Sequence, residues 1–213
     1  MASAISHAVA ALSLGACFYR PGMPKRVLVA GALCSILPDL DVIGFHFGIR
    51  YGDFWGHRGF THSLLFAAIL AAIVTILVSR HAPLTVLSSR TQSRGLCGNG
   101  GEGSAFRFFR FRFLPSAFYF RLWTYLFLAT ASHGLLDAMT DGGLGVAFFS
   151  PFNNHRYFLP WRPIRVSPIG VSRFFSDRGL EVLSSELLWI WLPSALLAAL
   201  AWLWHRRAVT HDS

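Results

Sequence analysis

SLLFAAILAAIVTILVS, residues 63–79, decides the fold of this chain, because these 17 consecutive residues carry no charged side chain. A membrane-spanning helix needs about 20 predominantly apolar residues, with roughly 17 to 25 tolerated. We therefore predict that residues 63–79 form a helix inside a membrane.

Four further apolar stretches flank this one, and the composition of the whole chain agrees with them. The chain has 213 residues, of which 54% are hydrophobic and 14% charged, whereas a soluble domain carries about 25% charged residues. The prediction is an all-α integral membrane helical bundle with about five membrane-embedded helices, forming a single domain over residues 1–213. Three widely spaced cysteines give no disulfide framework. The four flanking stretches are Ala4–Tyr19, Val27–Phe45, Ala117–Asp137 and Leu187–Trp204.

The first stretch has an alternative interpretation as a cleaved signal peptide. Residues Leu14–Cys17 resemble a lipoprotein cleavage box, and cleavage there would remove His7. A signal peptide begins with a basic region, however, and no Lys or Arg precedes Arg20. We expect the stretch to be retained as a helix.

The segments between the stretches differ in their content of basic residues. Of the 19 Lys and Arg residues, 12 follow the first, third and fifth stretches, and seven lie on the other side. Cytoplasmic segments carry the Lys/Arg excess. The predicted topology has five spans, with the amino terminus outside and the carboxyl terminus inside.

A basic insertion at about residues 80–115 separates the third and fourth stretches. Residues Ser88–Ser104 are rich in Gly, Ser and Arg, which predicts flexibility. Arg then alternates with Phe over Arg107–Phe113. Such a pattern can stack on single-stranded nucleic acid or lie at an anionic membrane surface. We favour the membrane surface and expect no nucleic-acid partner.

Polar residues that are rare in membranes fall at the predicted outer ends of the spans. Ionisable side chains near the apolar core of a membrane are costly and are usually paired and functional. We predict that they gather into one metal site on the outer side of the membrane. The candidate ligands are His7, Asp39, Asp41, His57, His62, His133, Asp137 and Glu186.

Local spacing supports this cluster on the second and fourth stretches. His133 and Asp137 are four residues apart and share one face of a helix. Pro38 is expected to break the second helix. Asp39 and Asp41, two apart in the extended segment that would follow, are then expected to point the same way.

The third stretch is preceded by the run His57-Arg58-Gly59-Phe60-Thr61-His62-Ser63. Gly59 is expected to permit a turn through which His57 and His62 converge. Thr61 is expected to cap the third helix and to place His62 in its first turn.

The donor types indicate a divalent metal and hydrolytic chemistry. Imidazole nitrogens with carboxylate oxygens suit zinc, which we favour, or manganese or iron, and six or more ligands would allow two adjacent ions. Asp41 is the candidate general base, and Arg58 and Arg156 are candidates for holding an anionic substrate group. No Gly-rich phosphate loop, G-x-S-x-G elbow or H-E-x-x-H helix is present.

Each assignment has a simpler alternative. His7 alone could be a satisfied core residue, and Glu186 could cap the fifth helix beside Ser184 and Ser185. Arg58 and Arg156 could be ion-pair partners of nearby acids.

The ordered motifs resemble the YdjM-type family. They are His7, the Leu37–Asp41 run, the His57–Ser63 run, His133-x-x-x-Asp137-x-x-Thr140 and Pro151–Phe158, and the resemblance extends from His7 to about Glu186. That family is described as LexA-regulated inner-membrane proteins and, by inference, metal-dependent hydrolases. It is more distantly similar to zinc-dependent phospholipase C. The resemblance implies a multi-pass protein of the bacterial inner membrane; the basic insertion matches no part of the pattern.

We expect a metal-dependent hydrolase that acts on phosphoester bonds of lipid or lipid-linked substrates at the membrane surface, with membrane lipids as its partners. Two alternatives stay open. The chain could be a transporter or a proton or metal-ion pathway protein, although its polar residues crowd one side. It could also be a non-catalytic scaffold that binds metal for stability.

Overall fold

The computed structural model describes residues 1–20, 23–80, 116–167 and 177–211, and the predicted insertion lies almost wholly outside them. Within this part the only regular elements are helices, as predicted; its two β-bridges, Thr140–Ile164 and Val146–Tyr157, are isolated. The elements are α1 (Ala4–Phe18), α2 (Arg26–Ile36), the 3-10 helices η1 (Leu37–Phe47) and η2 (Phe60–His62), α3 (Leu64–Arg80), α4 (Ser116–Ala138), α6 (Asp177–Glu186), the π-helix η4 (Leu187–Trp191) and α7 (Leu192–His211).

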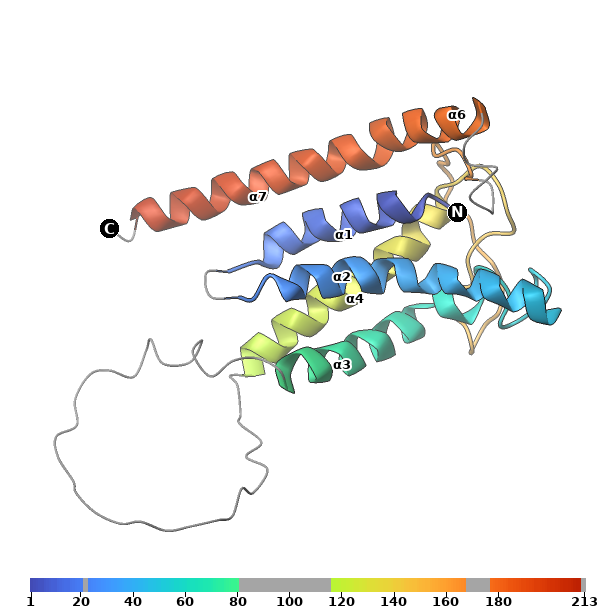
Figure 1. Ribbon diagram of the computed structural model, residues 1–213, viewed down its shortest axis with the longest axis horizontal. Coiled ribbons are helices and arrows are strands. Elements are labelled where there is room, and N and C mark those ends of the chain that lie inside the picture. Colours follow the sequence, from blue (N-terminus) through green and yellow to red (C-terminus); the bar gives the residue numbers. More distant parts are fainter. Residues whose placement is uncertain (21–22, 81–115, 168–176, 212–213) are drawn as a thin grey trace, which may run out of the picture.

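The long helices run alternately between two ends of a bundle (Figure 1). The beginning of α1, the end of η1, η2, the end of α4 and α6 lie together at one end, which we call the loop end. Helix α4 packs against α1, α2 and α3, whereas α7 packs against α1. The chain therefore returns to the loop end after every second long helix.

The core of the bundle contains small residues around Tyr125 of α4. The hydroxyl of Tyr125 donates to the carbonyl oxygen of Ala11 at 3.3 Å and lies 3.5 Å from that of Leu28. A Cβ added at Gly31 would collide with the Tyr125 ring, and one added at Gly15 would collide with the Tyr125 hydroxyl and the Leu28 side chain. Small residues let the backbones of neighbouring helices approach closely in membrane bundles, so these two glycines bring α1 and α2 against α4.

Two of the described helices are long and apolar enough to cross a membrane. They are the continuous α2–η1 helix, Arg26–Phe47, with 22 residues, and the continuous α6–α7 helix, Asp177–Arg207, with 31 residues. Helices α1 and α3 are apolar but shorter, with 15 and 17 residues. The described structure thus supports two spans directly, and the number five stays a prediction.

The expected break at Pro38 is confirmed only in part: the α-helix α2 ends at Ile36, but the chain stays helical where an extended segment was expected. Pro38 lies at the start of η1, and the chain continues as a 3-10 helix to Phe47. Proline is tolerated in a first helical turn because its missing N–H has no intrahelical partner there. Asp39 and Asp41 therefore do not lie in an extended segment. With three residues per turn, side chains two positions apart point about 120° away from each other.

The chain turns before α3 at Gly59, as predicted, but Arg58 rather than Gly59 takes the positive φ. Arg58 takes the positive φ of 63°, and a Cβ at Gly59 would collide with the carbonyl oxygens of Phe54 and Gly56. Thr61 does not cap α3, contrary to the prediction: the Ser63 hydroxyl accepts the N–H of Phe66 at 3.1 Å, and Thr61 lies in η2. The hydroxyl of Thr61 is thereby free to reach the site.

Residues 139–167 form an irregular segment that covers the loop end. Its backbone is fastened to distant parts of the chain: Ala147 N–H donates to the Arg58 carbonyl at 3.0 Å, and Ser167 N–H donates to the Met1 carbonyl at 2.9 Å. Phe148 accepts the N–H of Leu64 at 3.0 Å. These bonds hold the beginning of the chain, the turn before α3 and the end of α4 together.

Candidate metal centre

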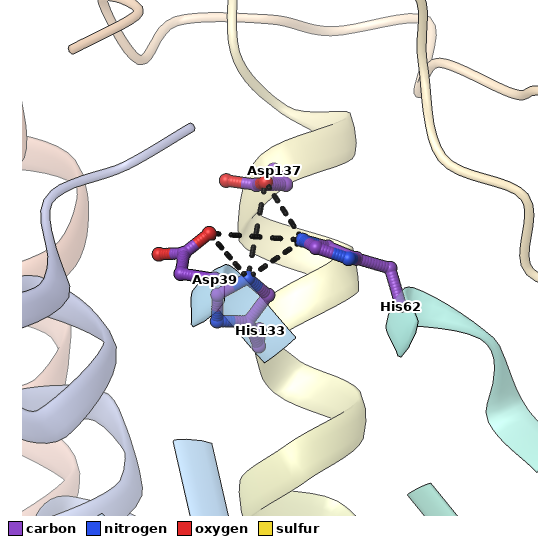
Figure 2. Close-up of side chains that lie close together, drawn as sticks. All are labelled: Asp39, His62, His133 and Asp137. Carbon is purple, nitrogen blue, oxygen red and sulfur yellow. Dashed lines mark hydrogen bonds and ion pairs between the residues drawn. The ribbon is translucent and has the colours of Figure 1, made fainter. Parts of the chain in front are cut away.

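Four buried side chains from three separate segments converge at the loop end (Figure 2). Asp39 comes from η1, His62 from the end of η2, and His133 and Asp137 from one face of α4. One potential ligand atom of each lies within 4.8 Å of those of the other three. The α4 pair uses the i, i+4 spacing, which places both side chains on the same face.

The distances within this group are those of side chains facing a common centre. His133 Nε2 lies 3.0 Å from His62 Nε2 and 3.3 Å from Asp39 Oδ1. His62 Nε2 is 3.7 Å from Asp39 Oδ1 and 3.6 Å from Asp137 Oδ2. Two nitrogens and two carboxylate oxygens thus point inward at a separation that a shared cation would bridge.

The outer nitrogen Nδ1 of each histidine has a partner, which leaves Nε2 facing the centre, where a cation would replace any proton that Nε2 carries. His133 Nδ1 lies 2.7 Å from the carbonyl oxygen of Ser35, which can only accept, so Nδ1 carries the proton. His62 Nδ1 is 3.2 Å from Asp41 Oδ2. In metal sites a ligating histidine usually donates its second N–H to a carbonyl or a carboxylate. Both histidines show that arrangement.

Unsatisfied polar atoms test whether a metal fits. Both oxygens of Asp39 and both ring nitrogens of His7 are buried without a hydrogen-bond partner in the described structure. Such burial is costly unless another group compensates it. Burial disfavours a charged imidazole at His62, but the carboxylates of Asp137, Asp39 and Asp41 outweigh it and raise the pKa of His62 to about 10. The cluster therefore attracts positive charge, and its donors fit zinc, manganese or iron.

Asp41 connects the group to His57 from outside. Its Oδ1 lies 2.7 Å from His57 Nδ1, and its Oδ2 accepts the Thr61 hydroxyl at 2.7 Å and faces His62. Asp41, His57 and His62 also satisfy the distances of a second metal group. The short contact with His57 and the occupied second oxygen fit an orienting role for Asp41 better than the predicted role of general base.

His7 lies beside the four residues. Its ring stacks on that of His133 with a centroid distance of 3.7 Å, and its Nε2 is 3.6 Å from Asp137 Oδ1. The imidazole is completely buried. Because neither ring nitrogen has a hydrogen-bond partner, His7 is the nearest candidate for a fifth ligand.

Two sequence comparisons match almost the whole chain. The sequence profile of the family described as YdjM inner membrane protein matches residues 1–208. The inner membrane protein YbcI of Escherichia coli (strain K12) is 36% identical over 207 residues, covering 97% of this chain and 100% of YbcI. This chain belongs to the YdjM inner membrane protein family.

Membership in the YdjM family establishes an inner-membrane protein and leaves the reaction open. Both descriptions name a membrane location and no activity. The distant similarity to zinc-dependent phospholipase C finds no support in them. No solved structure matches this chain, so the geometry described above carries the functional argument.

Glu186 of this YdjM-family chain lies outside the four-residue group. It is completely buried, and its Oε2 accepts the hydroxyls of Ser3 at 2.6 Å and Ser6 at 2.7 Å. Its Oε1 accepts the backbone N–H of Ser3. The carboxylate thus anchors the first turn of α1, which carries His7, and neither metal group includes it.

Arg58 is used inside the fold. Its guanidinium is completely buried and donates to Asp137 Oδ2 at 3.1 Å, the Thr140 hydroxyl at 2.9 Å and the Gly142 carbonyl at 2.8 Å. This geometry fits the ion-pair alternative better than a role in holding substrate. By fixing Asp137, Arg58 also partly neutralises the carboxylates of the site.

Arg156 fastens the loop that precedes His57. It donates to the carbonyl oxygens of His57 at 2.8 Å, Tyr51 at 3.0 Å and Asp53 at 3.2 Å. It also lines a pocket of about 140 Å³ together with Asp53, Phe54, Gly59 and other residues of these loops. Three of the five guanidinium N–H donors are thus used by the backbone, and this geometry fits a structural role for Arg156 better than a role in holding substrate.

Sequence reasoning missed the residues that orient the site. Ser3 and Ser6, the carbonyl of Ser35 and the hydroxyl of Thr61 all bind site residues or their anchor. Ser3 had a detectable signal: a serine just before an apolar helix is a typical N-cap, and its Oγ accepts the N–H of Ser6 at 3.3 Å. The carbonyl of Ser35 had none.

Proposed function

We propose that this chain is a metal-dependent hydrolase of the inner membrane that acts on phosphoester bonds of lipid or lipid-linked substrates. The observation that carries the proposal is the convergence of His62 Nε2 and His133 Nε2 with oxygens of Asp39 and Asp137 in a buried group. A divalent cation held there would polarise a phosphoryl or acyl oxygen. The residues of the chain would hold and orient this centre.

The charges of the described residues suit such a centre. Asp39 and Asp137 supply two negative charges, and Arg58 pairs with Asp137 from the far side. Asp41 holds both His57 and His62 in place through their Nδ1 atoms. Rigid orientation of the ligands is what a catalytic metal site requires, since small displacements are costly in rate.

Exposed aromatic residues at the loop end support a lipid-linked substrate. Phe47 at the end of η1 is 80% exposed, and Phe152 in the covering segment is 87% exposed. Trp55 is also exposed, two residues before His57. Trp side chains concentrate at the boundary between a membrane and water, and exposed Phe side chains can enter the headgroup region there. The centre would then lie at the level of the lipid headgroups, and we propose that this level faces the periplasm.

Elemental analysis of the purified protein tests the proposal most directly. Wild type is expected to contain a transition metal, His133→Ala to lack it, and His155→Ala to retain it, because His155 is exposed and away from the group. A screen of phosphoester and ester substrates in detergent then tests hydrolysis, which should follow metal content across the three proteins. Metal-free wild type with ordinary thermal stability would refute the proposal.

A second candidate function is a metal-stabilised membrane scaffold. The side chains of His62, His133 and Asp137 are completely buried, and that of Asp39 is 8% exposed. A closed shell of four protein ligands is typical of structural zinc sites, whereas catalytic sites keep one position open. Bound metal that stabilises the protein, together with no hydrolysis in the screen, would favour the scaffold.

A transport function has less support in the described part of the chain. Its buried histidine, acidic and arginine side chains are His7, Asp39, His57, Arg58, His62, His133, Asp137 and Glu186, and all lie at the loop end. A pathway would need polar groups in both leaflets. Metal-dependent flux into liposomes without hydrolysis would nevertheless favour transport over hydrolysis.

A further inference from the structure

A groove of about 450 Å³ lies between α1 and the helix formed by η4 and α7. One face of α1 contributes Val9, Leu12 and Ser13. The opposite wall is formed by Leu187, Trp191, Leu192, Ser194, Ala195 and Ala198. The lining is mainly apolar, and its volume falls in the range of small-molecule sites, about 300–1,000 Å³. None of these residues belongs to the metal centre.

The π-helix shapes one wall of the groove. Glu186 is fixed to Ser3 and Ser6 by hydrogen bonds, and Trp191 Nε1 donates to the Ser6 hydroxyl at 2.8 Å. The wider turn of η4 places both Glu186 and Trp191 against the first turns of α1. Single π-turns within α-helices occur frequently at functional sites.

The position of the groove relates it to one leaflet of the membrane. It extends along the Asp177–Arg207 span from Leu187, near the loop end, to Ala198. Eleven residue steps in a helix correspond to about 16 Å, and half of a hydrocarbon core is about 15 Å. The wall of the groove formed by η4 and α7 is therefore about as long as the leaflet at the loop end is deep.

The width of the groove restricts what can fill it. A volume of 450 Å³ over about 16 Å gives a mean width of roughly 6 Å for the centres of water-sized molecules, and therefore roughly 9 Å between the lining atoms. A helix of a partner protein, with a diameter of about 10–12 Å, is too wide. Water has too few polar partners there, and an empty groove would deprive the lining atoms of dispersion contacts.

We propose that this groove binds one acyl chain of a phospholipid from the leaflet at the loop end. The chain fits because it is apolar, narrow and as long as the leaflet is deep. The hydrophobic effect contributes little to this binding, because the acyl chain moves from an apolar lipid environment into an apolar groove. Packing contacts with the lining residues therefore hold the chain in place. The bound lipid is a component of the α1–α7 interface, whatever reaction the metal centre performs.

Photo-cross-linking in vesicles tests the proposal. The full-length protein is reconstituted with phosphatidylethanolamine that carries a diazirine on its acyl chain, and the labelled residues are mapped. Wild type is expected to be labelled on Val9–Ser13 of α1 and on the groove face of α7. Ala195→Trp fills the groove and should lose the α1 labelling, whereas Leu196→Trp, on an exposed position outside the groove, should keep it.

Metal content and unfolding temperature, measured on the same samples, show whether each variant is folded. If Ala195→Trp does not fold, Ala198→Phe serves as the second variant. It places a side chain smaller than Trp at the end of the groove farthest from the loop end. Uniform labelling around α7, or unchanged α1 labelling in the folded groove variants, would overturn the proposal. So would disulfide trapping of two copies through this face, with Cys at Leu12 and Leu192, because a second copy would then occupy it.

Discussion

Substitution of Asp39 or of Asp41 by asparagine is expected to lower metal affinity for two different reasons. Asp39 faces His62 and His133 within the metal group, so Asp39→Asn removes a ligand charge. Asp41 faces the outer nitrogens of His57 and His62, so Asp41→Asn disturbs only their orientation. The two substitutions therefore separate a ligand from an orienting residue.

The magnitude follows from the contacts. In Asp41→Asn a single amide oxygen replaces two acceptors, and the amide NH₂ would face a donor, either His57 Nδ1–H or the Thr61 hydroxyl. Loss of an orienting partner typically lowers metal affinity 10- to 100-fold, which corresponds to about 1.4–2.7 kcal/mol. Asp39→Asn is expected to exceed this range, because a buried metal ligand is lost outright.

The assay is metal retention by detergent-purified protein after equilibration with graded concentrations of a chelator. The matched control is Asp53→Asn, since Asp53 is a partly exposed surface residue that pairs with Arg50, and it should retain metal as wild type does. Wild-type affinity in Asp39→Asn, or a larger loss in Asp41→Asn than in Asp39→Asn, would refute the assignment. The second outcome would place the cation between Asp41 and His57.

Four further outcomes are expected. Removing the metal with a chelator should lower the unfolding temperature, and zinc or manganese should restore it, because the buried carboxylates lose their compensating charge. Arg58→Met should cost about 3–5 kcal/mol of stability in chemical unfolding, since it removes one cationic partner of the buried Asp137 carboxylate and the donors to Thr140 and Gly142; an effect below 1 kcal/mol would contradict the buried ion pair. Ser6→Ala should cost about 1–3 kcal/mol by leaving Glu186 short of a donor, while metal stoichiometry stays unchanged. Burial alone would raise the pKa of Asp141, but hydrogen bonds from a backbone N–H and an arginine lower it. The stability that the ionised Asp141 contributes is present above its unfolded-state pKa near 4 and is lost as pH falls through its lower folded-state pKa. The unfolding temperature of wild type should therefore fall more on acidification than that of Asp141→Asn.

The order of the helices was accessible from the sequence because length and hydrophobicity determine it. Once alternate crossing is assumed, every second helix end returns to the same side. His7, Asp39, His62 and His133 could therefore be assigned to one end before any coordinates. Membrane depth is less accessible, since α1 and α3, with 15 and 17 residues, are shorter than a full span.

The division of roles within the site was not accessible from the sequence. Whether Asp39 and Asp41 share a direction depends on the helix type after Pro38, and an 11-residue 3-10 helix is much longer than the usual run of three to four residues. The partners of Glu186 lie about 180 residues away at Ser3 and Ser6, and no local pattern reports so distant a contact. Periodicity locates faces of helices, whereas tertiary packing decides which groups meet.

The Tyr125 contacts described above give the bundle a second fastening of a different chemical kind. At the loop end, charged side chains from η1, η2 and α4 are expected to depend on a cation for their mutual attraction. Nearer the other end, Tyr125 joins α1 and α2 to α4 through neutral hydrogen bonds and glycine contacts. If the cation is removed, the helices are therefore expected to separate at the loop end, while the contacts of Tyr125 keep α1, α2 and α4 together nearer the other end.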